Sequence, residues 1–521
     1  MNRLATYWSH GPALSLSTGV LLGLSFPPFG LPVLQIPAFV FLFRVADLSS
    51  GWRELAVGAY GAFLVWNLIA TYWLMMATLA GGTAAILANS LLMLIPLLII
   101  RYLLRSGIHP AVTPPLIAAI WVSYEFLHHN WDLAWPWLAL GNGWADSTSL
   151  IQYISVTGHL GISFWVVVTA AVFYRAAAFA SKKHLACAVL LALLFPAISL
   201  VMKAGYQEKS AQRLDVAVVQ PNMNSYREYG GLATVDDLLT LLLELSDSAR
   251  TETTDLIVWP ENAIDSLIPR GNRFNATIRD SLRSWGTELI TGTGYIDYYE
   301  SGSEPSLVRG NISGRAYNIF NAAFHFTGER LPDIYKKGKL VPIVERIPFA
   351  ESLSALDMSG QVNWGEIAGY GRGFHANNFL IGDQHATPAL ICYDSVFSHW
   401  VGNFVRNGAG FLTIITNDGW WGDTSGHKQH FSYARLRAIE FRRWIVRSAN
   451  NGISGIISPD GSIRVETGYG IRTAFAQPIH PSDVMTFYAR YGNWFNWLML
   501  AVAVAGTAFT VRRGRLNRTG N

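Results

Sequence analysis

Long apolar runs separated by short polar loops fill the first two fifths of the chain. Seven runs lie at 12–25, 31–43, 55–77, 83–100, 113–127, 160–180 and 185–202, and an eighth lies at 491–511. A helix needs about 20 apolar residues to cross the hydrocarbon core of a bilayer. Several runs are shorter, and a buried core helix is the alternative for any one of them. Eight together favour a polytopic α-helical membrane domain of about eight helices.

Between about 213 and 481, strand-like and helix-like runs alternate. β-Branched and apolar runs predict strands at 214–220, 256–259, 288–291, 317–326, 333–337, 389–392, 411–416, 445–448 and 454–458. Helical spacing predicts helices at 235–245, 274–285, 396–407 and 431–445. This alternation is typical of a layered α/β domain. We expect a membrane domain at 1–203, an α/β domain at 204–487, and a final membrane helix with a basic tail at 488–521.

The composition supports a membrane protein with a water-exposed portion. Only 14% of the residues are charged and 51% are hydrophobic, whereas soluble domains carry about 25% charged residues. The net charge of +4 comes without a basic stripe, so we expect no nucleic-acid partner. No small-residue cleavage site follows the first apolar run, which predicts a retained anchor rather than a signal peptide.

Positive charge is distributed unevenly between the loops. With the N-terminus in the cytoplasm, the loops on that side hold Arg44, Arg53, Arg101, Arg105, Lys182 and Lys183, and the tail holds Arg512, Arg513, Arg515 and Arg518. The opposite loops, 26–30, 80–82 and 128–158, contain no Lys or Arg. By the positive-inside rule, residues from about 203 to 492 face outward. In a bacterium with two membranes, this predicts an inner-membrane protein whose α/β domain faces the periplasm.

The loop at 128–158 is rich in tryptophan. It carries Trp131, Trp135, Trp137 and Trp144, and because indole rings favour the headgroup level, we expect the loop to lie at the outer membrane interface. His128 and His129 are adjacent, but they lack Cys or carboxylate partners at ligand spacing. The sequence therefore predicts no metal site, and nothing in it indicates a cofactor.

One thiol follows a predicted buried strand. The chain has two cysteines, and because Cys187 lies in a long apolar run, the two are not expected to form a disulfide. Cys392 follows the strand at 389–392 and precedes a helix-like segment, an arrangement that presents nucleophiles in α/β folds. A small buried hydrophobe is the alternative interpretation.

Two further reactive side chains also follow predicted strands. Glu261 comes after the strand at 256–259, and Lys337 ends the strand at 333–337. A carboxylate can take the proton of a thiol, and a cation lowers the thiol pKa and stabilises an oxyanion. Either residue alone could be a solvated surface charge. Together, Glu261, Lys337 and Cys392 supply a base, a cation and a nucleophile.

Short motifs around these residues resemble those of the nitrilase, or carbon–nitrogen hydrolase, superfamily. They are Trp259-Pro260-Glu261, Tyr335-Lys336-Lys337 with Leu340-Val341-Pro342 and Glu345, and Cys392-Tyr393. With seven apolar segments before this domain and one after it, the whole chain resembles the apolipoprotein N-acyltransferase family of the bacterial inner membrane. The resemblance implies an αββα sandwich with a Glu261–Lys337–Cys392 triad.

The resemblance also implies supporting roles for other residues. Glu345 matches a second important carboxylate of the family, and Tyr393 matches the residue after the nucleophile, near which backbone N–H groups would bind the oxyanion. Asp394 departs from the more usual Glu, and Ile343-Val344 departs from the more usual Phe-Gly. We expect Trp420 and Trp421 to lie on a loop that grips lipid, with core packing as the alternative.

The reaction implied by the resemblance is acyl transfer between lipids. A fatty acyl chain would pass from a phospholipid, usually phosphatidylethanolamine, to Cys392 as a thioester, and then to the α-amine of the diacylglyceryl-cysteine that begins a lipoprotein. A membrane-anchored amidase with the same triad is the alternative, but it would have no need of eight membrane segments. A transporter would leave the three strand-end residues unexplained.

Overall fold

The structure, a computed structural model, describes residues 10–107, 109–208, 212–264, 273–357 and 362–519. The N-terminal stretch 1–9 and the side chains of Arg515 and Arg518, which entered the orientation argument, lie outside the described residues. The chain forms two compact units. The first contains Met1–Gln207, Lys428–Glu440 and Thr486–Asn521, and the second contains Glu208–His427 and Phe441–Met485.

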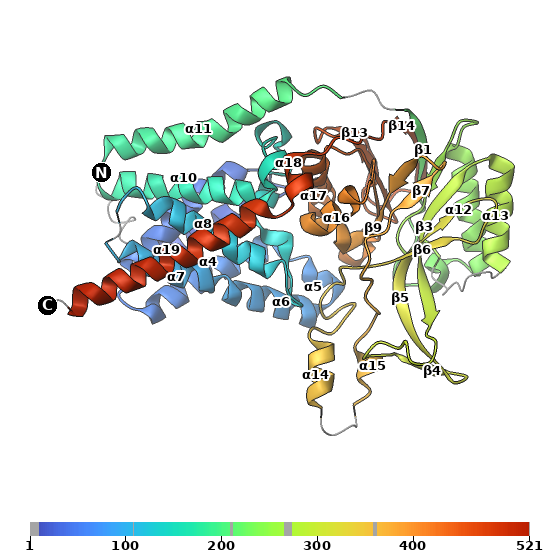
Figure 1. Cartoon of the computed structure of the whole chain (residues 1–521), viewed down its shortest axis with the longest axis horizontal. Coiled ribbons are helices and arrows are strands. Elements are labelled where there is room, and N and C mark those ends of the chain that lie inside the picture. Colours follow the sequence, from blue (N-terminus) through green and yellow to red (C-terminus); the bar gives the residue numbers. More distant parts are fainter. Residues whose placement is uncertain (1–9, 108, 209–211, 265–272, 358–361, 520–521) are drawn as a thin grey trace. The chain divides into compact units, whose positions relative to one another are not determined.

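The first unit is helical (Figure 1). Its helices include α2 (Gly11–Leu24), α3 (Gln35–Leu48), α4 (Trp52–Thr71), α5 (Leu74–Ala77), α6 (Leu79–Leu92), α7 (Leu94–Leu104), α8 (Thr113–His128), α9 (Ile154–Thr157), α10 (Leu160–Ala178), α11 (Lys182–Ala204), α18 (Phe487–Tyr491) and α19 (Trp494–Thr519).

Five stretches of the described chain are long and apolar enough to cross a membrane. They are Trp52–Thr71, Leu79–Leu104, Leu160–Ala178, Lys182–Ala204 and Trp494–Arg513. They correspond to five of the eight predicted runs. The other three runs form the shorter helices α2, α3 and α8, of 14, 14 and 16 residues.

One predicted loop, 80–82, is part of a helix instead. The side chain of Thr78 accepts a hydrogen bond from the backbone N–H of Gly81. This N-cap satisfies a backbone donor at the helix end, so α6 begins at Leu79. Gly81 and Gly82, expected between two apolar runs, lie in its first turn.

Glycines allow α2 to pack closely on α4. A Cβ atom at Gly19 would lie 2.4 Å from the carbonyl oxygen of Ala62, and one at Gly23 would lie 2.5 Å from Cβ of Ile69. Neither contact is possible for a larger residue without displacing a helix, because interiors are close-packed. The apolar run at 12–25 therefore forms a tightly packed interior helix.

The tryptophan-rich loop is partly a core element of its unit. Trp137 is 1% exposed, and its Nε1 donates to Oε1 of Gln429 at 2.7 Å. Gln429 lies on α17 (Ser425–Phe441), and its Nε2 donates to the carbonyl oxygens of Pro27 and Ala70. Trp131, by contrast, is 39% exposed. A buried indole such as that of Trp137 is hydrogen-bonded inside the unit. Only the exposed part of the loop is therefore available to the membrane interface.

The second unit contains two main β-sheets. In the larger, the strand order is β14-β1-β2-β3-β5-β4, and β6 also pairs with β5; in the smaller, it is β13-β12-β11-β10-β9. The strands are β1 (Leu214–Gln220), β2 (Leu256–Val258), β3 (Glu288–Tyr298), β4 (Gly310–Ile312), β5 (Arg315–Phe326), β6 (Asp333–Lys336), β9 (Ala389–Ile391), β10 (Leu412–Thr416), β11 (Ile445–Ala449), β12 (Gly455–Ile457), β13 (Ile463–Glu466) and β14 (Thr473–Ile479).

The two sheets face each other, and helices cover their outer faces. The hydroxyl of Ser448 on β11 donates to the carbonyl oxygen of Val219 on β1 at 2.8 Å, which joins the sheets. Helices α12 (Val235–Ala249) and α13 (Arg273–Trp285) share a hydrophobic core with the larger sheet. Helix α16 (Ser398–Arg406) connects the parallel strands β9 and β10, and such crossovers lie on a sheet face. The unit is an αββα sandwich.

Candidate active site

The three candidate catalytic residues follow strands from both sheets. Glu261 lies three residues beyond β2, and Lys337 directly follows β6; both strands belong to the larger sheet. Cys392 directly follows β9 of the smaller sheet. The strand-end positions expected from the sequence are therefore present, and the site is built across the two sheets.

A buried ammonium group joins two carboxylates. Nζ of Lys337 donates to Oε1 of Glu345 at 2.8 Å and to Oε1 of Glu261 at 3.2 Å. Nδ2 of Asn321 donates to the same two oxygens, at 3.0 Å and 2.8 Å respectively. The Lys337 side chain is only 1% exposed. Two donors thus hold both carboxylates in one fixed arrangement.

Backbone groups hold the remaining carboxylate oxygens. Oε2 of Glu261 accepts from the backbone N–H of Asn417 at 2.9 Å, and Oε2 of Glu345 accepts from that of Val341 at 2.7 Å. A Cβ atom at Gly292 of β3 would lie 2.5 Å from Cα of Glu261. A glycine is therefore required where β3 passes behind Glu261.

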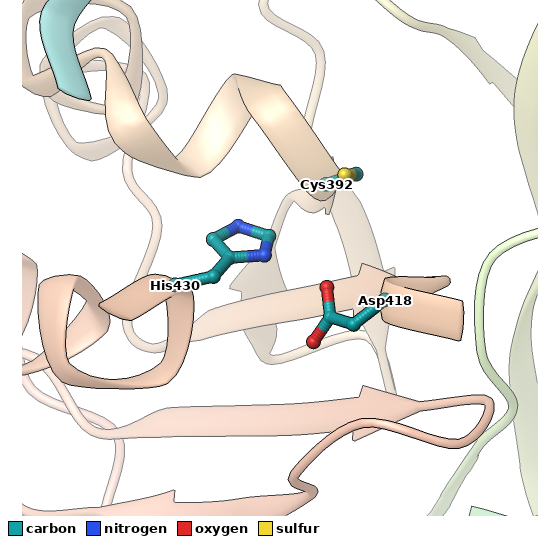
Figure 2. Close-up of side chains that lie close together, drawn as sticks. All are labelled: Cys392, Asp418 and His430. Atoms are coloured by element: carbon teal, nitrogen blue, oxygen red, sulfur yellow. The ribbon is translucent and has the colours of Figure 1, made fainter. Parts of the chain in front are cut away.

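Cys392 occupies a strained turn. Its φ angle is +46°, in the left-handed region that non-glycine residues rarely adopt. Such strain collects at functional sites, where the surroundings over-determine the backbone. The sulfur lies within 4.8 Å of a carboxylate oxygen of Asp418 (Figure 2). Asp418 pairs with Arg447 at 2.8 Å, and both side chains are completely buried.

Burial and charge set the proton affinities of the site. Burial raises the pKa of Glu261, while Lys337 acts to lower it. Burial alone would lower the pKa of Lys337, but Glu261 and Glu345 raise it well above its usual range. Burial, reinforced by the charge of Glu261, also raises the pKa of Cys392, against the lowering effect of Lys337. Burial therefore favours the protonated thiol, on which the charge of the buried Glu261 carboxylate also acts.

Asp394 links the turn after Cys392 to the segment that carries Lys337. Its carboxylate accepts from the hydroxyl of Tyr335 at 2.8 Å, from the backbone N–H of Lys339 at 2.7 Å, and from that of Ile391 at 3.2 Å. Burial raises the pKa of Asp394 to about 6. The shorter Asp, where Glu is more usual, is therefore fully engaged in hydrogen bonds.

The remaining candidates lie at different depths. Tyr393 is 3% exposed and packs its ring on Phe397 at a centroid distance of 4.9 Å. Trp420 and Trp421 end the short helix Asp418–Trp421, and Trp420 is 38% exposed. Ile343 and Val344, which replace Phe-Gly, are 51% and 65% exposed. These two apolar side chains therefore lie on the surface of the unit.

Asn321 and Asp418 belong to this constellation but were not predicted from the sequence. Asn321 lies on β5 between Phe320 and Ala322 and is 4% exposed. A polar side chain within a buried strand must find partners, and that interruption of an apolar run was the available signal. No role was expected for Asp418, because its partner Arg447 is distant in the sequence.

We expect Asn321→Ala to slow acyl transfer by about tenfold to a hundredfold, because hydrogen bonds to charged groups contribute about 1.5–3 kcal/mol. The measurement is the rate of acyl transfer to a lipopeptide, with thermal unfolding as a check of folding. Asn318→Ala is the matched control, since Asn318 lies on the same strand but bonds Tyr299 and Leu307 instead. Equal losses in both variants would contradict a specific role for Asn321.

Family models match both parts of the chain. The model for the apolipoprotein N-acyltransferase N-terminal domain matches residues 18–172, and the carbon–nitrogen hydrolase model matches residues 215–484. Among solved structures, Saccharomyces cerevisiae Nit3, of the nitrilase superfamily, aligns with a TM-score of 0.38 at 16% identity, over 55% of this chain and 97% of its own. That likeness is too weak to add to the family matches.

Curated relatives match over nearly the whole length. The apolipoprotein N-acyltransferase of Chlorobaculum tepidum is 30% identical over 94% of this chain and 94% of its own. That of Geobacter metallireducens is 26% identical over 96% and 95%, and that of Pseudomonas syringae pv. tomato is 26% identical over 95% and 98%. The N-terminal match lies outside the hydrolase domain, so an amidase is not favoured. The chain belongs to the apolipoprotein N-acyltransferase family, within the carbon–nitrogen hydrolase superfamily, and its function is the N-acylation of lipoproteins.

Proposed function

We propose that Cys392 carries the acyl group as a thioester, that Glu261 moves the protons, and that Lys337 stabilises the oxyanion. The observation that supports this most is the sharing of Lys337 between two buried carboxylates, while the charges of Lys337 and Glu261 both act on the thiol. A base must be near its proton, and a cation must face the developing negative charge. Glu345 keeps Lys337 charged and in position.

In the first step, Glu261 takes the thiol proton and the sulfur attacks an ester carbonyl carbon of the phospholipid. The C–S bond forms, and the carbonyl oxygen becomes an oxyanion that faces Lys337 and backbone N–H groups near Tyr393. The ester C–O bond then breaks. Glu261 returns the proton to the leaving glyceryl oxygen, which releases a lysophospholipid. The acyl group remains on Cys392.

In the second step, the α-amine of the acceptor cysteine attacks the thioester carbon. A C–N bond forms and the C–S bond breaks through a second oxyanion. Glu261 takes a proton from the attacking nitrogen and returns one to the sulfur, so the thiol is restored. Because the acyl group waits on the enzyme, the two bulky lipids need not be bound at the same time.

Phosphatidylethanolamine is the proposed donor, and diacylated apolipoproteins are the proposed acceptors. Each methylene group removed from an apolar environment costs about 0.8 kcal/mol. Drawing a two-chain lipid fully into water would therefore be very unfavourable. A membrane domain in the same chain avoids this cost because it keeps the catalytic domain beside the lipid.

The proposed location is the bacterial inner membrane, with domains at 1–203, 204–487 and 488–521 and the catalytic domain in the periplasm. Loop charges support this orientation.

A single Cys introduced at exposed Gly302 should react with a membrane-impermeant maleimide in intact spheroplasts, whereas one at Arg105 should react only after lysis. Both positions are tested in a Cys187→Ala background. The reverse labelling would overturn the orientation.

The catalytic proposal is tested by mass spectrometry. Purified full-length protein incubated with phosphatidylethanolamine should gain one fatty acyl mass on the peptide that contains Cys392. Neutral hydroxylamine should remove it, because thioesters are cleaved where amides are not. An acyl group on a different residue, or transfer to a lipopeptide without any acyl-enzyme, would overturn the proposal.

A further inference from the structure

A small polar pocket adjoins the proposed base. Its volume is about 230 Å³, and its lining includes Asn224, Ser225, Asn262, Tyr370, Asn417 and Trp420. All of these residues belong to the second unit. Asn262 directly follows Glu261, and the backbone N–H of Asn417 donates to Glu261. The pocket therefore opens beside the carboxylate that would move the protons.

The amide of Asn417 leaves its NH₂ group available in this pocket. Its Oδ1 accepts from the backbone N–H of Gly419 at 3.3 Å and from the hydroxyl of Ser225 at 2.8 Å. A backbone N–H can only donate, so it fixes which end of the amide is oxygen. In the described part of the chain, Nδ2 of Asn417 has no acceptor, although the residue is only 5% exposed. Asn417 lines the pocket, so this amino group can donate to an external acceptor placed there.

Tyr370 offers a second group to a ligand. Its hydroxyl forms no hydrogen bond with the described residues, while the backbone of Tyr370 is held by Glu345 and Arg346. Burial, and then the charges of Glu345 and Glu261, raise the pKa of this hydroxyl, and Tyr370 lines the pocket. The main chain is thus fixed, and the hydroxyl remains available.

The chemistry of the lining indicates the class of ligand. Among the described lining residues there are amides, hydroxyls and an indole, and none has a charged side chain. Phosphate and carboxylate groups are usually bound by Arg or Lys. Each peptide unit instead presents one neutral donor and one neutral acceptor, which amides and hydroxyls can match.

We propose that this pocket binds the peptide backbone that follows the N-terminal cysteine of the lipoprotein acceptor. The inference rests on the proposed function, because the attacking amine must reach the Cys392 thioester next to Glu261. The peptide chain continues from the same acceptor cysteine, so its first residues must lie close to Glu261 and Cys392. A pocket of this kind would hold any lipoprotein sequence, since it contacts main-chain atoms rather than side chains.

The test separates the two half-reactions in Tyr370→Phe and Asn417→Asp proteins. Acyl-enzyme formation from phosphatidylethanolamine is measured by mass spectrometry. Transfer is measured to two acceptors. The peptide acceptor is diacylglyceryl-cysteine followed by four further residues, and the short acceptor is diacylglyceryl-cysteine amide, which has no peptide after the cysteine. We expect Tyr370→Phe to raise the KM for the peptide acceptor by about two- to tenfold, because one neutral hydrogen bond is lost. Asn417→Asp keeps the acceptor oxygen but removes the donor, and should raise this KM further.

The short acceptor shows whether the pocket acts on the peptide or on the reaction in general, because it lacks the peptide. Its KM should not change in Tyr370→Phe, and neither should the rate of acyl-enzyme formation. Tyr299→Phe is the matched control, because Tyr299 accepts from Asn318 away from the pocket. Equal effects on the KM of both acceptors would overturn the inference. A slower first half-reaction alone would also overturn it, because the pocket would then bind the headgroup of the donor lipid. No acylation of Cys392 in the unaltered protein would instead overturn the proposed function, and this inference with it.

Discussion

Replacement of Cys392 by alanine is expected to abolish acyl transfer while the protein remains folded. The proposed thioester cannot form without the sulfur, so the loss should reach the detection limit rather than a fractional decrease. The change removes a single buried atom at 8% exposure, and alanine can adopt the same turn at a modest strain cost. The measurements are lipopeptide acylation, acyl mass on the Cys392 peptide, and thermal unfolding.

The second cysteine supplies the control. Cys187 is exposed and lies on α11, outside the catalytic unit. Cys187→Ala should keep full transfer activity and the full acyl mass on the Cys392 peptide. Measurable turnover in the Cys392→Ala protein, with a normal unfolding temperature, would remove this thiol from the mechanism.

Much of the catalytic unit could be predicted because local patterns there agree with the final structure. The run at 214–220 is observed as β1 without any change in its bounds, and 333–337 differs from β6 by one residue. Short apolar runs bounded by polar residues specify buried strands well. In contrast, β13 and β14 were not predicted, since their burial is incomplete, β13 is only four residues long, and β14 contains a proline. Their formation depends on pairing with β12 and β1.

Long-range contacts account for what the sequence could not provide. The strand-end rule placed Glu261, Lys337 and Cys392 at one edge, but only the paired sheets show that the thiol comes from the opposite sheet. Asn321 could not be connected with two carboxylates 60 and 24 residues away. Gln429 likewise contacts residues from distant parts of the chain. Such pairings carry no local periodicity, so pattern analysis cannot detect them.

Replacement of Lys337 by methionine is expected to slow thioester formation by about a hundredfold to a thousandfold, the usual effect of removing an oxyanion-stabilising donor. Methionine is similar in length but leaves Glu261 and Glu345 buried together without a cation. Because Lys337 acts to lower the pKa of Glu261, its removal should raise that pKa further. A base works only when deprotonated, so the rising limb of the pH–rate profile should move to higher pH. Single-turnover acylation of Cys392 across pH measures both effects.

The preceding residue separates this effect from a general loss of charge or stability. Lys336 pairs with Asp297 at 2.5 Å, and its side chain is 32% exposed. Successive strand residues point to opposite faces, so Lys336→Met should leave the acylation rate and its pH profile unchanged, with a stability change of at most about 1 kcal/mol. Lys337→Met should also lower stability, by about 3–5 kcal/mol, since it leaves buried charges unpaired. A slower rate in Lys337→Met with no displacement of the pH profile would mean that the ammonium acts on the oxyanion alone and does not tune Glu261.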